Sequence, residues 1–330
     1  MKRAGRVAIL APHNDPQALA VQGEVRRLGE NAEIVDVGGL IHGAPWSTSV
    51  RAGKAVTTLD RHRLDSLRAV YVRQVPGPFP PLGRNARGRQ VVLSGWVAPF
   101  MMAKEREAVA QGLLMELHAR GVALLNPPSG GTLAQNKPFQ LMRAAALGIP
   151  VPRTLITNAP DEAYAFIRAV RRAIAKPVHG GALTVALDAG MLRKRDVRQQ
   201  LGRIRSAPVI LQERVDGDDV RVMLLDGRVI SSLAVRLPEG PVLDFRGSEA
   251  YQGGKATYER VTLPAAVQRQ AARWARECGL IFAGLDAKRT ARGKMVFLEC
   301  NSSPIYLDGE LKSGDAISAA VARWLVNRAT

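Results

Sequence analysis

Residues 285–301, LDAKRTARGKMVFLECN, hold acidic and amide side chains at positions that a β-hairpin would bring together. If Arg292-Gly293 forms a two-residue turn between two strands, Asp286 lies directly opposite Glu299. Side chains alternate between the two faces of a strand, so Asn301 emerges on the same face as Glu299. The segment therefore predicts three oxygen-bearing side chains that converge on one face of a hairpin.

Two carboxylates at facing strand positions lie about 5 Å apart at Cβ, and like charges there are unfavourable unless something offsets them. A hard divalent cation would do so, because Mg²⁺ and Mn²⁺ prefer carboxylate and amide oxygens. The spacing alone leaves a second interpretation open, in which this is a solvated hairpin edge that binds nothing.

The whole chain has 330 residues and a hydrophobic content of 46%, enough for a sizeable core in two or three lobes. No apolar run is long enough for a transmembrane helix, and the N-terminus lacks the features of a signal peptide. Cys278 and Cys300 have no metal-ligand spacing, and we expect them to be buried thiols in a reducing compartment. The expected location is the cytoplasm, with no membrane partner.

A strong positive charge distinguishes the composition. The 47 basic and 29 acidic residues give a formal net charge of +18, which attracts polyanions such as nucleotides, nucleic acid or acidic peptides. The arginines are scattered, however, and aromatic residues make up only 5%, so no base-stacking platform is evident. Dedicated nucleic-acid binding is therefore the less favoured interpretation.

The N-terminal third has the pattern of an α/β unit with parallel strands. Strands are predicted over 6–11, 32–37 and 69–75, with a helix between the first two. The stretch 38–65 is predicted to be irregular, and the Pro/Gly-rich segment 76–88 to be a loop.

Helices and strands also alternate in the remainder of the chain. Helices are predicted over 102–119, 134–147, 160–172, 191–204, 264–278 and 315–327. Strands are predicted over 122–126, 172–178, 185–188 and 208–215. Residues 127–131, PPSGG, are predicted to form a turn, and Asp226-Gly227 to close a further hairpin.

Two lysines could contact phosphates. Lys137 opens a predicted helix, and Lys176 lies on a strand just before His179-Gly180-Gly181, where the backbone can approach a ligand closely. Solvated surface lysines are the simpler interpretation of each position taken alone. No P-loop motif is present, so a bound nucleotide would not occupy a Walker-type site.

The sequence resembles the ATP-grasp ligases, specifically the RimK-like branch and the related graspetide (microviridin-type) synthetases that modify ribosomal peptides. The resemblance rests on five segments. They are NPPSGGTLAQNKPFQLMRAAALGIPVPRTLITN (126–158), IAKPVHGG (174–181), LQERVDGDDVR (211–221), LDFRGSEAYQGG (243–254) and GLDAKRTARGKMVFLECNSSP (284–304). It covers the chain well from about residue 125 and more loosely before that point.

This resemblance implies an α/β fold of the ATP-grasp type (α+β in the ATP-grasp lobes). Three domains are expected: an N-terminal pre-ATP-grasp domain over 1–126, a central subdomain over 127–206 and a C-terminal subdomain over 207–330. The implied enzyme is a ligase that forms C–N, or C–O, bonds while it converts ATP to ADP and phosphate.

The resemblance also implies roles for individual residues. The ligands of one or two magnesium ions, or manganese ions, would be Asp286, Glu299 and Asn301. The residues that bind the nucleotide would be Lys137, Lys176, Gln212, Glu213, Arg214, Val215, Asp219 and, more weakly, Ser248. The catalytic cations facing the transferred phosphoryl group would be Arg221 and Arg246, and the segment Leu237–Lys255 would be a mobile loop that excludes water.

The implied substrate is a carboxylate that ATP activates as an acyl phosphate, with an amine or hydroxyl as the nucleophile. A basic surface suits an acidic peptide or protein substrate. Within the class, the alternative is a RimK-like ligase that adds glutamate to a small acceptor or a protein. Outside the class, the alternatives are a non-catalytic ATP-binding regulator and a nucleic-acid-binding protein. Assembly into homo-oligomers is common among similar enzymes.

Overall fold

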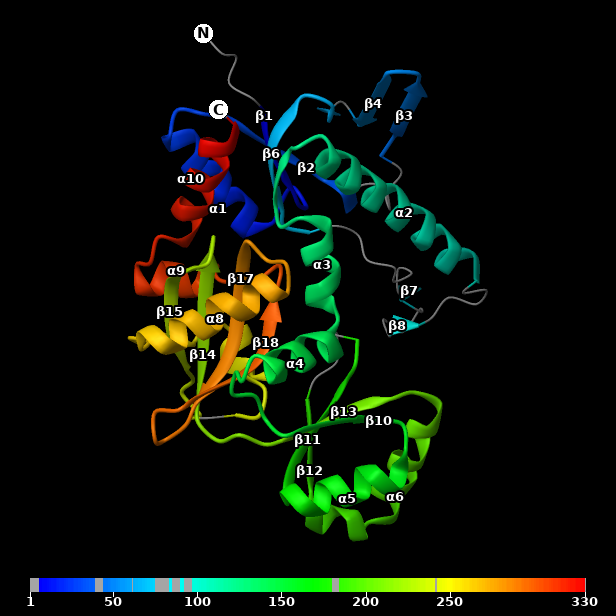
Figure 1. The fold of residues 1–330 in the computed structure, drawn as a ribbon, viewed down its shortest axis with the longest axis vertical. Coiled ribbons are helices and arrows are strands. Elements are labelled where there is room, and N and C mark those ends of the chain that lie inside the picture. Colours follow the sequence, from blue (N-terminus) through cyan, green and yellow to red (C-terminus); the bar gives the residue numbers. More distant parts are fainter. Residues whose placement is uncertain are drawn as a thin grey trace. The chain divides into compact units, whose positions relative to one another are not determined.

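The computed structural model describes residues 6–38, 44–60, 62–74, 83–84, 90–91, 97–179, 184–240 and 242–329. The chain forms two compact units (Figure 1). One unit comprises Met1–Pro128 together with Ser318–Thr330, and the other comprises Ser129–Ile317.

The first unit is built on a parallel four-stranded sheet in the order β2-β1-β6-β9. Its strands are β1 (Arg6–Leu10), β2 (Ala32–Val35), β6 (Leu67–Val72) and β9 (Ala123–Leu125). Its helices are α1 (Pro16–Arg27), α2 (Val97–Ala119) and most of α10 (Ile317–Ala329). The short apolar runs of the strands supply the buried core, as the predicted α/β pattern requires.

The prediction that residues 38–65 are irregular was wrong for most of that stretch. Strands β3 (Trp46–Arg51), β4 (Lys54–Leu59) and β5 (His62–Arg63) form a small antiparallel sheet. Most of β3 is exposed on both faces, so no hydrophobic alternation marks it in the sequence. The predicted loop over 76–88 lies outside the described residues, except for β7 (Gly83–Arg84), which pairs with β8 (Gln90–Val91).

The second unit contains two antiparallel sheets. The smaller has the order β10-β13-β11-β12, with strands β10 (Thr154–Thr157), β11 (Arg172–Pro177), β12 (Val185–Asp188) and β13 (Val209–Glu213). Helices α5 (Pro160–Val170) and α6 (Arg195–Gly202) pack against it through a core that includes Ile167, Leu201 and Leu211. The predicted helix over 191–204 is divided here, because the 3₁₀ turns η2 (Ala189–Arg193) and η3 (Arg203–Ser206) flank α6.

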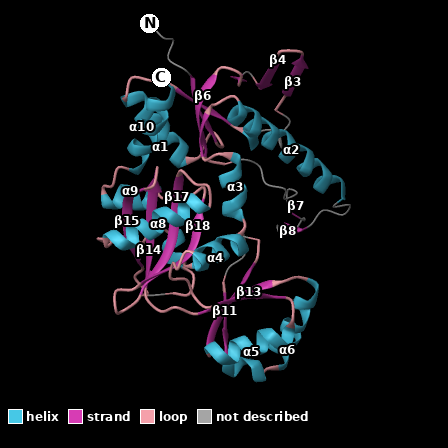
Figure 2. Cartoon of the chain, in the orientation of Figure 1, coloured by secondary structure: helices cyan, strands magenta, loops and turns pink. Residues whose placement is uncertain are grey.

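The larger sheet has the order β16-β15-β14-β17-β18. Figure 2 shows β15, β14, β17 and β18 of this sheet. Its strands are β14 (Asp218–Leu225), β15 (Arg228–Arg236), β16 (Thr257–Arg260), β17 (Phe282–Arg289) and β18 (Met295–Asn301). Asp226 and Gly227 both have positive φ and close the β14–β15 hairpin, so that predicted turn is confirmed. Helices α7 (Glu249–Gln252), α8 (Ala265–Glu277) and α9 (Leu307–Ser313) complete this part of the chain.

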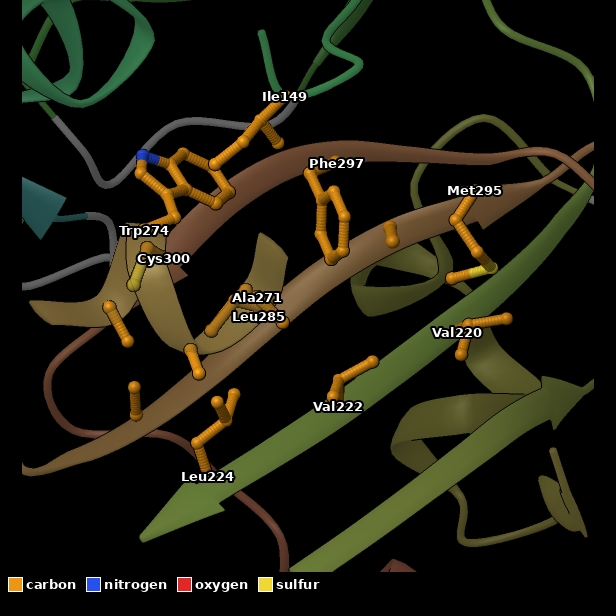
Figure 3. Packing of buried hydrophobic residues seen from close by; sticks show 14 of the residues in the cluster. Ile149, Val220, Val222, Leu224, Ala271, Trp274, Leu285, Met295, Phe297 and Cys300 are labelled. Atoms are coloured by element: carbon orange, nitrogen blue, oxygen red, sulfur yellow. The ribbon is translucent and has the colours of Figure 1, made fainter. Parts of the chain in front are cut away.

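One face of the larger sheet forms a core with α8. Val220, Val222 and Leu224 alternate along β14 and are buried against the helix, together with Phe297 and Trp274 (Figure 3). The two rings meet edge to face, with centroids 6.0 Å apart. The intervening residues of each strand must then lie on the opposite face, which is the face that carries the polar side chains.

Two helices replace the predicted turn at 127–131 and the single helix over 134–147. α3 (Pro128–Gln135) starts at a proline, and α4 (Lys137–Ala146) starts after Asn136, whose side chain accepts a hydrogen bond from the amide of Phe139 at 3.0 Å. Gly130 allows a close approach, because a β-carbon there would lie 2.2 Å from the carbonyl oxygen of Gly279. Among the described residues, no helix has both the length and the apolar character needed to cross a bilayer.

Candidate functional site

The β17–β18 hairpin brings Asp286 and Glu299 to facing positions, as predicted. The turn itself differs from the prediction. The amide of Thr290 donates to the carbonyl of Lys294 at 3.0 Å, which leaves a three-residue connection that ends in Gly293 with φ +75°. This is the loop type in which the last residue adopts the left-handed conformation that glycine favours.

A β-bulge reconciles the longer turn with the predicted pairing. Near the turn, Ala287 pairs with Phe297, but the register shifts before the next pair, and Leu298 is the extra residue on β18. Without this shift, Leu298 would lie opposite Asp286, and Glu299 would point toward α8. The bulge therefore places Phe297 on the core face and Glu299 on the polar face.

The three predicted oxygen donors lie together. The side-chain amide of Asn301 donates from Nδ2 to Oδ2 of Asp286 at 3.3 Å. Cations flank both carboxylates: Nε of Arg221 is 3.1 Å from Oδ1 of Asp286, and Nζ of Lys137 is 3.6 Å from Oε2 of Glu299. These contacts offset the repulsion that two facing carboxylates would otherwise have.

Buried contacts fix the backbone that carries Glu299. The side chain of Gln140 accepts a hydrogen bond from the amide of Cys300 at 2.9 Å and donates to the carbonyl of Cys300 at 3.0 Å. On the neighbouring strand, a β-carbon at Gly284 would lie 2.4 Å from Cβ of Pro304, so only glycine fits under that proline. Both cysteines are free and buried, as predicted.

A cavity of about 760 Å³ lies at this hairpin and is lined by residues of both sheets of the second unit. Most of the residues predicted to bind a nucleotide, and two of the three predicted metal ligands, line it. They are Lys137, Lys176, Gln212, Glu213, Arg214, Val215, Asp219, Asp286 and Glu299. The volume falls in the range typical of small-molecule and cofactor sites.

Strand β13 places Gln212 in this lining, fully buried. Its Nε2 donates to Oγ1 of Thr154 at 2.9 Å, whereas its Oε1 is buried and accepts no hydrogen bond. A buried polar atom without a partner is costly, so this acceptor is suited to a donor that arrives with a ligand.

Ion pairs hold the acidic turn between β13 and β14. Asp216 is bound by Arg172 at 2.5 Å, and Asp218 by Arg289 at 2.9 Å and by Arg236. The hydrogen bond from Arg236 is the main reason that the pKa of Asp218 lies below its ordinary value. These ion pairs therefore stabilise the turn, which also forms part of the cavity wall.

Asp219 differs from its neighbour because it is more deeply buried. Burial raises the pKa of Asp219, and this effect outweighs the opposing contact with Lys288, whose Nζ lies 2.8 Å from Oδ1. Lys288 is itself buried and lines the cavity. Lys288 was not predicted from the sequence, although its position two residues after Asp286 places it on the same strand face.

Arg221 is the best-anchored cation of the site. Besides Asp286, it binds the carbonyl of Ile305 through Nη1 at 2.7 Å, and its guanidinium lies 5.3 Å from the ring centroid of Phe245. Burial has the largest single effect and lowers the pKa of Arg221, but Asp286, Tyr251 and Tyr258 together raise it, and the net shift is upward. Arg221 therefore stays charged.

Arg221 and Asn301 join this group through Asp286, although neither is among the residues that line the cavity. The structure does not bring two other predicted residues into the group. Ser248 caps α7 by accepting a hydrogen bond from the amide of Tyr251 at 3.2 Å, bonds to Glu239, and is not among the residues that line the cavity. Arg246 lies in the short turn η4 (Phe245–Gly247), and its side chain is outside the described part of the structure.

The oxygen donors fit a magnesium ion. Within the described ranges, no three His, Cys, Asp or Glu side chains gather as a metal-binding cluster. The set at this hairpin is instead two carboxylates and one amide, Asp286, Glu299 and Asn301. Mg²⁺ is commonly held by one or two carboxylates together with water and substrate phosphates, so a smaller protein ligand set suffices.

The fold and this site define a class. The sequence profile of the RimK-like ATP-grasp domain matches residues 132–325, more than half of the chain. The chain therefore belongs to the RimK-like ATP-grasp family, and it has the mixed α/β fold of that family. It is an ATP-dependent ligase, and ATP with Mg²⁺ is the nucleotide and metal pair that ligases of this class bind.

Similar proteins include glutamate ligases. A ribosomal protein bS6–L-glutamate ligase of Escherichia coli O7:K1 (strain IAI39 / ExPEC) is 29% identical over 226 residues, which cover 66% of this chain and 72% of that protein. A probable alpha-L-glutamate ligase of Citrobacter koseri is 28% identical over 225 residues, with the same coverage of both chains.

Solved structures of peptide-modifying ligases resemble the whole chain. The ATP-grasp ligase PsnB, in complex with a phosphomimetic variant of its minimal precursor, Mg and ADP, has a TM-score of 0.81 and 28% identity and covers 98% of both chains. The macrocyclase MdnC of Microcystis aeruginosa MRC, bound to the precursor peptide MdnA, has a TM-score of 0.75 and 18% identity and covers 98% of this chain and 99% of that one. The second likeness concerns the fold alone.

Proposed function

We propose that the cavity binds ATP with magnesium and activates a carboxylate side chain of an acidic peptide or protein, which is then joined to an amine or a hydroxyl. The observation that carries this proposal is the meeting of Asp286 and Glu299 in the wall of a nucleotide-sized cavity, with Asn301 bonded to Asp286 and cations beside both carboxylates. Facing carboxylates are unfavourable unless a cation serves them, and Mg²⁺ prefers these ligands.

In this proposal, strand β13 and the turn after it bind the nucleoside. Gln212, Glu213, Arg214 and Val215 line the wall that would contact adenine and ribose, with Asp219 beyond them. The buried Oε1 of Gln212, which accepts no hydrogen bond, suits the exocyclic amino group of adenine. Ser248 would act on the nucleotide only indirectly, because it caps α7.

Lys137 and Lys176 would bind the phosphates. Both line the cavity, and Lys137 already lies 3.6 Å from Glu299, one of the proposed metal ligands. One or two magnesium ions, which manganese could replace, would be held by Asp286, Glu299 and Asn301. When bound, the metal would supply charge neutralisation at the phosphate oxygens.

The chemistry requires a substrate carboxylate to attack the γ-phosphorus of ATP, which forms an acyl phosphate and releases ADP. The nucleophile then attacks the acyl carbon, and inorganic phosphate leaves as the amide or ester forms. Arg221, and Arg246 beside Phe245, would stabilise negative charge on the transferred phosphoryl group and on the leaving phosphate. The protein positions these groups and supplies no covalent catalyst of its own.

Water must be excluded, since it would hydrolyse the acyl phosphate. The segment Leu237–Lys255 is suited to this role. Oγ1 of Thr184, the residue before β12, donates to Asp244 of this segment at 3.3 Å, and Lys312 holds the end of the segment through the carbonyl of Gly254 at 2.7 Å. A segment tied at its end and in contact with the opposite wall can open and close over the cavity.

Two kinds of acceptor are compatible with the similar proteins. The likeness to PsnB, which was solved with a precursor peptide, and the +18 charge support an acidic peptide whose own side chains are joined. The likeness to bS6–glutamate ligases supports the addition of free glutamate to a protein or small acceptor.

Mass spectrometry distinguishes the joining of a peptide's own side chains from the addition of free glutamate. The full chain would be incubated with ATP, Mg²⁺ and an acidic peptide containing Lys, Ser and Thr, with and without free glutamate. Loss of one water mass per bond, independent of glutamate, is expected for the first proposal, whereas a gain of glutamyl residues would support the second. ATP binding that ignores both Mg²⁺ and the substitution Glu299→Ala would contradict the proposed site.

A further inference from the structure

A second groove, of about 910 Å³, lies along α8. Its walls are the outer side of that helix, the β14–β15 turn and the chain after α4, and none of its described lining residues belongs to the nucleotide cavity. The cavity and this groove are on opposite sides of the larger sheet, because α8 covers the core face. We refer to this surface as the arginine groove.

Four arginines line the arginine groove. Arg269, Arg273 and Arg276 recur at intervals of four and three residues along α8 and are exposed on one side of it, and Arg228 adds a fourth exposed guanidinium from the β14–β15 turn. The helix and the turn meet here, because a β-carbon at Gly227 would lie 3.3 Å from Nη1 of Arg276.

These arginines have no acidic partner among the described side chains. Glu277 follows Arg276 in sequence, but its carboxylate binds Arg143 instead, at 2.8 Å. By comparison, Arg172, Arg236 and Arg260 of the same unit each form an ion pair. Clustered like charges repel one another in the free protein, so a negatively charged group bound in the arginine groove would reduce this repulsion.

Packing does not explain the arginines either. The opposite side of α8 attaches the helix to the sheet through Ala271, Ala272, Trp274 and Ala275, all of them buried. That contact would exist with any polar residue at the exposed positions. The fold therefore does not require these four charges.

The shape and chemistry of the arginine groove favour a polypeptide partner. Leu147, Ile149 and Val229 contribute apolar side chains beside the guanidinium groups. A segment with both carboxylates and apolar side chains matches this mixture, whereas nucleic acid presents a uniformly charged backbone. The described lining also lacks the aromatic side chains on which bases stack.

The spacing sets the register of such a segment. Arg269 and Arg276 are separated by two helical turns, about 10 Å along the axis. Carboxylates two turns apart on one face of a partner helix would meet them. We propose that the arginine groove binds an acidic, partly apolar segment of a polypeptide partner, at a surface separate from the ligase site and independent of its chemistry.

The test uses the full chain and a fluorescein-labelled peptide built from Leu-Glu-Glu-Leu repeats, with fluorescence anisotropy as the readout. The triple variant Arg269→Gln/Arg273→Gln/Arg276→Gln removes three charges but keeps polar side chains of similar helix propensity on α8. Three lost ion pairs should weaken peptide binding about tenfold or more. A control peptide with Gln in place of Glu should bind neither protein.

A matched control removes the same charge elsewhere. Arg195, Arg203 and Arg205 are exposed on α6 and η3, and their triple change to Gln should alter peptide affinity by no more than about twofold. Equal losses in both triple variants would show diffuse attraction and overturn the proposal, as would equal binding by wild type and the α8 variant. Displacement of the peptide by single-stranded DNA of equal charge, with the same dependence on the three arginines, would also overturn it.

Discussion

The two faces of the β14–β18 sheet use the same strands for opposite purposes. On the face toward α8, Val222, Leu285 and Phe297 are fully buried in an apolar core (Figure 3). On the other face, the residues between them form ion pairs at the nucleotide cavity, such as Arg221 with Asp286 at 3.1 Å. Because side chains alternate along each strand, the same strands supply the stabilising core on one face and the ligand-binding groups on the other.

The two requirements conflict at one point, and the bulge at Leu298 resolves the conflict. Phe297 and Cys300 are three residues apart, yet both are buried on the core face, which a regular strand would not allow. The extra residue lets Glu299 reach the cavity without moving Phe297 out of the core. Changes on the cavity face should therefore affect catalysis, and changes on the core face should affect stability.

The largest expected effect comes from the cavity face. Asp286→Asn and Glu299→Gln each keep the side-chain shape but remove the charge that would hold the metal. We expect each to lower ATP turnover at least about thousandfold, about 4 kcal/mol in activation free energy, because metal neutralisation of phosphate charge is lost. Phosphate release in the presence of an acidic peptide substrate measures this.

The melting temperature should change little in both variants, since neither position belongs to the apolar core. Glu105→Gln, the same chemical change at an exposed position of α2, is the control and should retain full turnover. Turnover at the wild-type rate in both Asp286→Asn and Glu299→Gln would contradict the proposed site.

The next effect comes from the core face. Phe297→Ala removes a fully buried ring that packs on Trp274, and we expect a loss of about 3 kcal/mol in the free energy of unfolding of this unit. That loss corresponds to a fall of roughly 5–10 °C in the melting temperature, measured by thermal denaturation.

Leu298→Ala is the neighbouring control, because Leu298 is only half-buried and lines the cavity. It should cost clearly less stability than Phe297→Ala and should instead raise the ATP concentration needed for half-maximal turnover. Equal destabilisation by the two variants would mean that the faces are not separated as described.

The sequence predicted the pairing of Asp286 with Glu299, because hairpin geometry and strand alternation are local rules. It did not predict the three-residue turn or the bulge. The longer turn shifts the pairing of the two strands by one residue, and the bulge at Leu298 restores the predicted pairing. Lys288 was not predicted, because the burial of its side chain at the cavity follows from the three-dimensional fold and not from a local motif.

Other differences need the three-dimensional contacts. Strand β3 could not be recognised, since its side chains are exposed on both faces and follow no hydrophobic period. PPSGG has the composition of a turn, yet the chain is helical there, and the requirement for Gly130 comes from Gly279, which is distant in sequence. Family resemblance, by contrast, supplied the fold and the class of reaction.

The smallest expected effect concerns Asp218 and Asp219, the two adjacent residues at the start of β14. Asp218→Asn should cost about 1 kcal/mol of unfolding free energy at neutral pH, near the upper end for a partly exposed ion pair. The pKa of Asp218 is lowered in the folded chain, chiefly by Arg236, so its contribution is present above the ordinary value of 3.8 and is lost as the pH falls below it.

Asp219 should show the opposite sign. Its pKa is raised by burial, so between 3.8 and the higher folded value the folded chain holds a proton that the unfolded chain has released. Stability of the wild type relative to Asp219→Asn should therefore fall as the pH rises through that window. Melting temperatures of the two variants and the wild type at a series of pH values measure both slopes. Parallel pH profiles for Asp218→Asn and Asp219→Asn would show that burial does not dominate at Asp219.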